Sequence, residues 1–135
     1  MDEKQINPEA IIESWLISSQ ENYETMIDMY NSKRYNWALF LGHLSLEKLL
    51  KAYHVKVIKK HSPYIHNLLH LAKLSNIKLT KYQKEDFATI TNFNLNARYD
   101  DYKQSFYFKC TKEFTDKWIE TIKIHRLWII ELIKS

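Results

Sequence analysis

Residues 35–60, YNWALFLGHLSLEKLLKAYHVKVIKK, decide the fold of this chain. Large apolar side chains recur through the stretch at helical spacing and fall on more than one face: Trp37, Phe40, Leu41, Leu44, Leu49 and Val55. A helix that is apolar on several faces is covered by other helices, so the stretch predicts a central bundle helix from Tyr35 to Lys59. Gly42 costs such a helix about 1 kcal/mol relative to alanine, and its presence predicts the close approach of another helix.

One polar line crosses this central helix. His43, Glu47 and Lys51 follow one another at intervals of four residues, so they are predicted to stack along a single edge. The line fits an intrahelical salt bridge beneath a histidine, and it also fits one wall of a binding site.

The N-terminal part of the chain predicts a second long helix. Asn7 suits an N-cap, Pro8 suits the first helical position, and Glu9 favours the positive end of the helix dipole. Apolar residues then recur at helical spacing as far as Tyr30. The break at residues 31–33 is short, which predicts that the two long helices are antiparallel neighbours.

The C-terminal half predicts a shorter set of elements. A loop surrounds Pro63, HNLLHLAKLS (66–75) is a short helix, and Thr80 with Gln83 has the capping-box spacing of a helix that runs to about Phe93. Residues 96–106, NARYDDYKQSF, are predicted to be irregular, and a long helix closes the chain from about 111 to 134.

These elements predict a single all-α domain over residues 1–135, an up-and-down bundle of four main helices plus one short helix. The composition agrees, because one glycine and two prolines are too few for the turns of a sheet. Hydrophobic residues make up 45% and charged residues 27% of the chain, as in an ordinary folded domain.

Composition also bears on the compartment and the partners. The lone Cys110 cannot form an internal disulfide, the acidic N-terminus MDEKQINPEA does not resemble a signal peptide, and no apolar run is long enough for a membrane span. The chain is therefore expected to be cytoplasmic, with no membrane partner. Residues 33–81 hold ten lysines and arginines but only one acid, Glu47, which fits either a solvated surface or attraction to phosphates.

Several kinds of chemistry find no support in the sequence. His66 and His70 have metal-ligand spacing, but they lack a third ligand and are expected to cap or pack, so neither a metal nor any other cofactor is predicted. Cys110 is expected to be a buried, inert thiol. A single glycine excludes glycine-rich phosphate loops.

Arg98 lies in the stretch predicted to be irregular, among Tyr99, Tyr102 and Lys103. Its guanidinium suits a phosphate contact, and it equally suits a structural clamp on helix-end carbonyls or on Glu47. An up-and-down bundle can bring this stretch against His43, Glu47 and Lys51 of the central helix.

Four segments together resemble the HEPN family of small, mostly prokaryotic helical domains. They are YxWAxFL (35–41) followed by His43, EKxxKA (47–52), HNL (66–68) and ARY (97–99). The resemblance covers nearly the whole chain, from Trp15 to the last helix. It implies a homodimer, nucleotide or RNA binding, and a partner minimal nucleotidyltransferase in a toxin–antitoxin-like pair.

Many HEPN proteins cleave RNA without metal through an arginine and a histidine separated by four to six residues. Arg98 matches the arginine, but Lys103, Gln104 and Ser105 occupy the positions of the histidine. The sequence therefore predicts binding of nucleotide, RNA or the partner protein without robust nuclease activity, through Arg98, Tyr99, Tyr102, Lys103, Lys51, Glu47 and His43. One alternative is a ribonuclease toxin that uses Arg98 with a base from elsewhere, such as His43 or the other protomer. Another is a dimeric interaction module in which Arg98 pairs with Glu47 and no ligand binds.

Overall fold

The computed structural model describes residues 6–135 and confirms the all-α fold class. Its described part contains six helices and no strand. The helices are α1 (Pro8–Asn31), α2 (Tyr35–Ile58), α3 (Leu68–Leu74), α4 (Lys81–Arg98), α5 (Asp100–Lys109) and α6 (Lys112–Lys134). The first five residues of the predicted 1–135 domain, with half of the acidic N-terminal stretch, lie outside the described residues. Within residues 6–135, no helix is both long and apolar enough to cross a membrane.

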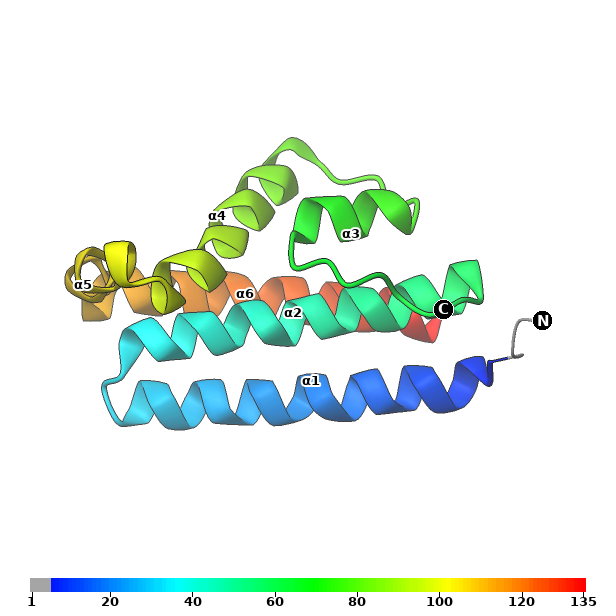
Figure 1. Ribbon diagram of the computed structural model, residues 1–135, viewed down its shortest axis with the longest axis horizontal. Helices are drawn as coiled ribbons and strands as arrows, with labels where there is room; N and C mark the ends of the chain where they lie inside the picture. The colour runs from blue at the N-terminus through cyan, green and yellow to red at the C-terminus, as the bar shows by residue number, and fades with distance from the viewer. Residues whose placement is uncertain (1–5) are drawn as a thin grey trace.

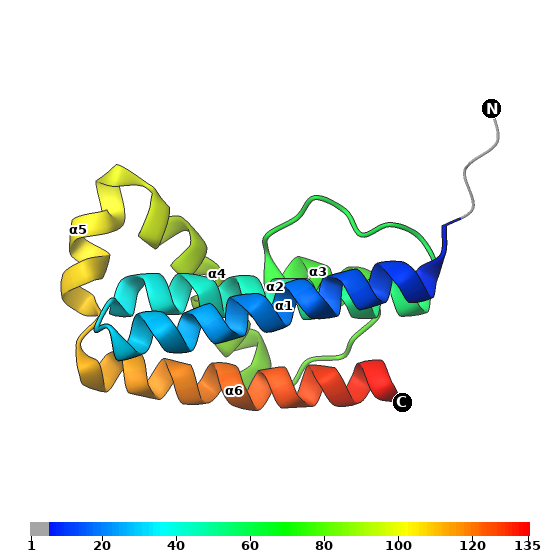
Figure 2. The same ribbon diagram turned by 90° about the horizontal axis from the view of Figure 1, so that it is seen from below.

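Three long helices run side by side and set the length of the molecule. Helices α1 and α2 form an antiparallel pair, and α6 lies along the same pair (Figures 1 and 2). Helices α3 and α4 lie over the other side of α2, and α5 sits at the end of the bundle where α1 turns into α2 (Figure 1). Helix α2 therefore contacts all five other helices, as its apolar pattern predicted.

The predicted helix starts are confirmed in detail. The Asn7 side chain accepts a hydrogen bond from the Ala10 amide at 3.2 Å and caps α1. Thr80 and Gln83 form both bonds of the capping box of α4, and Thr111 caps α6. These caps satisfy amides that have no partner inside their own helix, which is why their residue types could be read from the sequence.

Gly42 lies where α1, α2 and α6 meet. A methyl group at this position would lie 2.5 Å from Cδ1 of Ile122 on α6 and 3.1 Å from the sulfur of Met26 on α1. Ile122 and Met26 are both fully buried. The predicted close approach of another helix is confirmed, and it involves two helices.

The prediction that residues 96–106 are irregular is wrong. Helix α4 continues to Arg98, Tyr99 is extended at φ −87° and ψ 129°, and α5 begins at once with Asp100 and Asp101 in its first turn. Phe106 is the one buried residue of α5, and its ring lies 5.6 Å from that of Phe93 on α4. Because a single buried residue makes no periodic pattern, the amphipathic signal of a helix was absent.

Candidate functional site

The polar line on α2 forms a buried cluster, and its predicted stacking is confirmed. His43 is fully buried, and Glu47 and Lys51 are almost fully buried. Oε2 of Glu47 lies 3.0 Å from Nζ of Lys51, and the same ammonium group lies 5.3 Å from the ring centroid of Trp15 on α1. One carboxylate oxygen of Glu47 thus forms an ion pair with Lys51 of the same helix.

The other oxygen of Glu47 binds a histidine from outside the helix. Oε1 of Glu47 lies 3.0 Å from Nδ1 of His66, which comes from the loop before α3. The side chain of His66 is 59% exposed. Asn67, not His66, caps α3. The expectation that His66 caps or packs is therefore wrong, because its ring is held at the surface by a buried carboxylate.

His43 fixes the same loop through its backbone. Nε2 of His43 lies 2.8 Å from the carbonyl oxygen of His66, so the imidazole donates its proton there. Burial lowers the pKa of His43 below its ordinary value, the charge of Glu47 opposes this, and the charge of Arg98 adds to the lowering. A fully buried, neutral donor cannot touch a substrate, so the geometry argues against His43 as the catalytic base of the ribonuclease alternative.

The lowered pKa of His43 predicts how stability depends on pH. The unfolded chain binds a proton at this histidine near pH 6.5, whereas the folded chain resists it, so the contribution is complete above that pH and is lost as the pH falls. The slope from this one group is at most about 1.4 kcal/mol per pH unit. Urea unfolding at pH 7 and pH 5 should show a smaller difference for His43→Gln than for the wild type. Equal differences would contradict the assignment.

Arg98 is the last residue of α4. Its side chain is exposed, and Nε donates to the carbonyl oxygen of Asn94 at 3.2 Å. The guanidinium carbon lies 5.7 Å from the ring centroid of Tyr99. The positive charge of Arg98 contributes to the lowered pKa of His43. No carboxylate of residues 6–135 forms a salt bridge with Arg98; Glu47 pairs with Lys51 and His66 instead.

The predicted residues of α5 lie beside Arg98 with their side chains open to solvent. Tyr99 and Tyr102 are 52% and 47% exposed. Lys103 lies 3.6 Å from Asp100 and 6.0 Å from the ring centroid of Trp37, near the start of α2. The fold therefore brings His43, Glu47 and Lys51 together with His66. Arg98 is connected to this cluster through the effect of its charge on the pKa of His43, and Lys103 contacts Asp100 and Trp37 instead.

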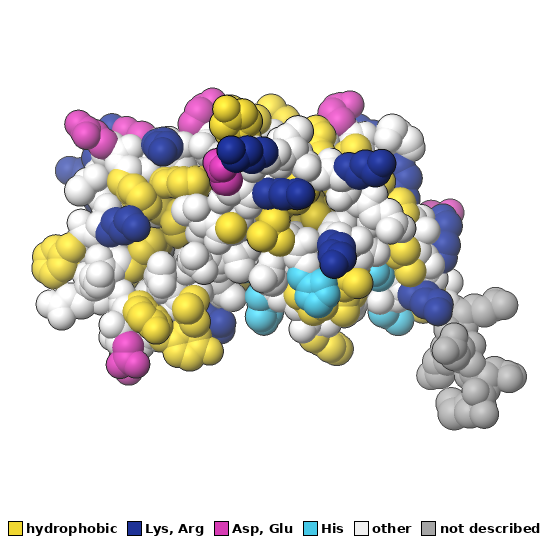
Figure 3. All heavy atoms as spheres, turned by 90° about the horizontal axis from the view of Figure 1, so that it is seen from above, with side chains coloured by type: hydrophobic (Ala, Val, Ile, Leu, Met, Phe, Trp, Pro, Cys, Tyr) yellow, Lys and Arg dark blue, Asp and Glu magenta, His cyan; other side chains and the backbone are white. Residues whose placement is uncertain are grey.

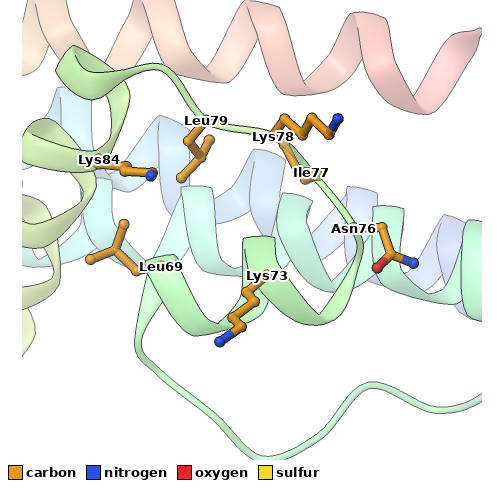
Figure 4. Close-up of a pocket in the computed structure, with 7 residues that line it drawn as sticks. All are labelled: Leu69, Lys73, Asn76, Ile77, Lys78, Leu79 and Lys84. Atoms are coloured by element: carbon orange, nitrogen blue, oxygen red, sulfur yellow. The ribbon is translucent and has the colours of Figure 1, made fainter.

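A separate basic groove lies at the other end of α4. It has a volume of ≈ 740 Å³ and lies between α3, the connection to α4 and the first turn of α4 (Figure 4). Its lining consists of Leu69, Lys73, Asn76, Ile77, Lys78, Leu79 and Lys84. On the face drawn in Figure 3, lysine and arginine side chains lie among hydrophobic ones, and histidines gather along one edge. None of the residues predicted for the site lines the groove.

Two features remain to be described, the thiol of Cys110 and the possible metal ligands. Burial raises the pKa of the Cys110 thiol to about 12, as expected of an inert buried cysteine. Among residues 6–135, no group of three or more histidine, cysteine, aspartate or glutamate side chains could hold a metal ion.

His66 is the site residue that sequence reasoning missed. Its signal was present, because the HNL triplet 66–68 was one of the four segments that carried the resemblance. What the sequence could not show is that the loop after α2 folds back along the helix, so that residue 66 returns to residues 43 and 47.

Comparison with known proteins supports the resemblance. No curated protein and no solved structure matches the chain. The model of the HEPN domain family matches residues 12–132, nearly the whole length of the bundle from α1 to the last turns of α6. The chain therefore belongs to the HEPN domain family.

Proposed function

We propose that this HEPN protein binds the phosphates of RNA or of a nucleotide through Arg98. The observation that carries the proposal is the state of Arg98: it is exposed, it is held in place by the Asn94 carbonyl, and it has no carboxylate partner in the described chain. A guanidinium with free N–H groups is suited to bind phosphate in a bidentate manner.

The surroundings of Arg98 favour a single-stranded ligand. The exposed rings of Tyr99 and Tyr102 offer faces on which a base can stack. Lys103 adds a cation on the next turn of α5, although Asp100 partly offsets its charge. Three residues of the proposed site are buried and do not touch the ligand: His43, Glu47 and Lys51. Their part is to hold His66 in position and to set the electrostatic potential around it.

Replacing Arg98 by alanine tests this proposal. We expect Arg98→Ala to leave the melting temperature nearly unchanged, because the exposed side chain makes one bond to its own helix. Its affinity for a fluorescent single-stranded RNA should fall, and its binding should depend less steeply on salt because one phosphate contact is lost.

The control for Arg98→Ala is Lys134→Ala, which makes the same charge change at an exposed position. Lys134 lies at the opposite end of the bundle from α5 (Figure 1), so we expect this variant to retain wild-type affinity. Loss of stability in Arg98→Ala, together with no binding of RNA or nucleotide by the wild type, would instead make Arg98 a structural clamp.

A two-fold dimer is the second part of the proposal. Trp118 is buried within the protomer, while Trp15 and Trp128 are partly buried and leave some apolar surface for a second protomer. Ile124 and Leu127 on α6 are 58% and 67% exposed and offer a different apolar surface. Light scattering at micromolar concentration should give twice the 16.4 kDa mass of the chain; a 16.4 kDa particle would contradict the dimer.

A partner minimal nucleotidyltransferase in a toxin–antitoxin-like pair, in the cytoplasm, completes the proposal. It is supported by membership of the family and by the free thiol of Cys110, which suits a reducing compartment. The rival form, a dimeric module in which Arg98 pairs with Glu47, lacks its central contact, since both oxygens of Glu47 bind other residues.

A further inference from the structure

The groove between α3 and the start of α4 has an apolar floor. Three of its lining residues are aliphatic and partly buried: Leu69, Ile77 and Leu79. Each of them packs against the hydrophobic core on one side, and the surface that remains lines the groove. The volume of ≈ 740 Å³ is within the range of sites that enclose a ligand.

The charged groups of the groove all carry the same sign. Lys73, Lys78 and Lys84 are exposed, and none of them forms a salt bridge among residues 6–135. In Figure 4, the side chain of Lys84 extends from α4 toward the space between Leu69 and Leu79. The lining contains no acidic residue. An anionic ligand would therefore meet three unpaired cations around an apolar surface.

One wall of the groove is a stretch of backbone without hydrogen-bond partners. Residues 76–79 form this wall, in the connection between α3 and α4. The N–H and C=O groups of Lys78 and Leu79 form no backbone hydrogen bond within residues 6–135. An extended peptide can bind such a stretch through its own backbone, as an added strand binds a free sheet edge. About four residues of an extended peptide would run along this wall.

Hydrogen bonds at both ends of α3 fix the shape of the groove. The amide of Leu68 donates to Oγ1 of Thr91 at 3.1 Å, which joins the start of α3 to α4. Beyond the other end of α3, the amide of Ile77 donates to the carbonyl oxygen of Ala72 at 2.9 Å. Asn76 makes the turn between them with φ 60°. A groove that is shaped before its ligand arrives lowers the ordering cost of binding.

We propose that this groove binds an extended acidic segment of a partner protein, with aliphatic side chains on the floor and carboxylates beside the lysines. The free backbone of the wall and the aliphatic floor favour a peptide over RNA, since the lining has no aromatic ring on which a base could stack. The groove involves the first turn of α4, whereas Arg98 is its last residue. The proposal therefore does not depend on phosphate binding at Arg98.

The probe is a fluorescein-labelled peptide, EDLDLDE, whose two leucines fall on one face of an extended chain. We expect saturable binding to the full-length protein by fluorescence anisotropy, and this binding should weaken with added salt. NMR spectra should show chemical-shift changes at the amides of Lys78, Leu79 and Lys84. The control peptide EDSDSDE should bind about tenfold more weakly or worse, because it has no apolar side chain for the floor.

Charge reversal at the rim tests the same contact from the side of the protein. Lys78→Glu with Lys84→Glu should weaken the binding of EDLDLDE about tenfold or more. The fold should be retained, because an acid at the start of α4 is favoured by the helix dipole. The matched control is Lys117→Glu with Lys134→Glu, which makes the same charge change at two exposed positions of α6. This control and Arg98→Ala should both bind the peptide like the wild type.

Three results would overturn the proposal for the groove. They are no saturable binding of EDLDLDE up to about 1 mM, binding that the rim variant leaves unchanged, and chemical-shift changes at the groove from single-stranded RNA but not from the peptide. The serine peptide and the NMR spectra test the wild-type protein, so they hold even if the rim variant fails to fold. Protein that binds the peptide but no RNA or nucleotide would contradict the proposal for Arg98 and support this one.

Discussion

Replacing Glu47 by leucine is expected to lower the free energy of unfolding by about 3–5 kcal/mol, because it leaves a buried ammonium group without its counter-charge. Lys51 is 5% exposed, and Glu47 is its one carboxylate neighbour within salt-bridge distance among residues 6–135. The variant also frees His66 from its anchor. Urea-induced unfolding followed by circular dichroism measures the loss.

The paired variant Glu47→Leu with Lys51→Met is the control for this prediction. It removes both charges and keeps similar volumes, so we expect it to recover most of the lost stability. Lys112→Met breaks another pair with the same spacing, Lys112 and Asp116 on α6, at the surface, so we expect a much smaller change there. A Glu47→Leu protein as stable as the double variant would mean that Lys51 reaches water and needs no partner.

Replacing Gly42 by leucine should lower the free energy of unfolding by about 3 kcal/mol, since a core without free space cannot accept an isobutyl group. The first carbon of the new side chain already lies 2.5 Å from Cδ1 of Ile122, and Ile122 is fully buried. Thermal and urea unfolding measure the effect.

Gly42→Ala separates the steric effect from helix propensity. Alanine gains about 1 kcal/mol of helix propensity and loses part of it by displacing the end of Ile122. Adding Ile122→Val removes Cδ1, so Gly42→Ala should stabilise the Ile122→Val background more than it stabilises the wild type. If the two gains were equal, Gly42 would not be in contact with α6.

The sequence predicted the parts of this fold that depend on short-range rules. The caps at Asn7 and Thr80, the start of the last helix near residue 111 and the central position of α2 follow from residue type and periodicity, and the structure confirms them. Helix α5 escaped prediction because Phe106 alone faces the core, and one apolar residue has no period. A helix is recognised in a sequence by apolar residues that recur at helical spacing, and α5 has no such repeat.

The candidate site was predictable in one half only. Intervals of four residues on one helix placed His43, Glu47 and Lys51 together without knowledge of the tertiary fold. The meeting of Glu47 with His66 depends on the course of the loop around Pro63, whose backbone direction no local pattern specifies. The same lack of long-range information left the partner of Arg98 open between Glu47 and a phosphate.

The attachment of α5 through Phe106 sets a limit on how tightly the site can hold a ligand. A helix that buries one side chain separates from its neighbours at a free energy well below that of global unfolding, so α5 is expected to exchange its amide hydrogens early. Arg98 belongs to α4, whereas Tyr102 and Lys103 belong to α5 and move away with it when α5 separates from the bundle. A ligand that contacts Arg98, Tyr102 and Lys103 together binds only those protein molecules in which α5 is docked. Its apparent affinity is therefore the intrinsic affinity multiplied by the fraction of protein with α5 docked. A substitution that fastens Phe106 more firmly would therefore tighten binding without adding a single contact to the ligand.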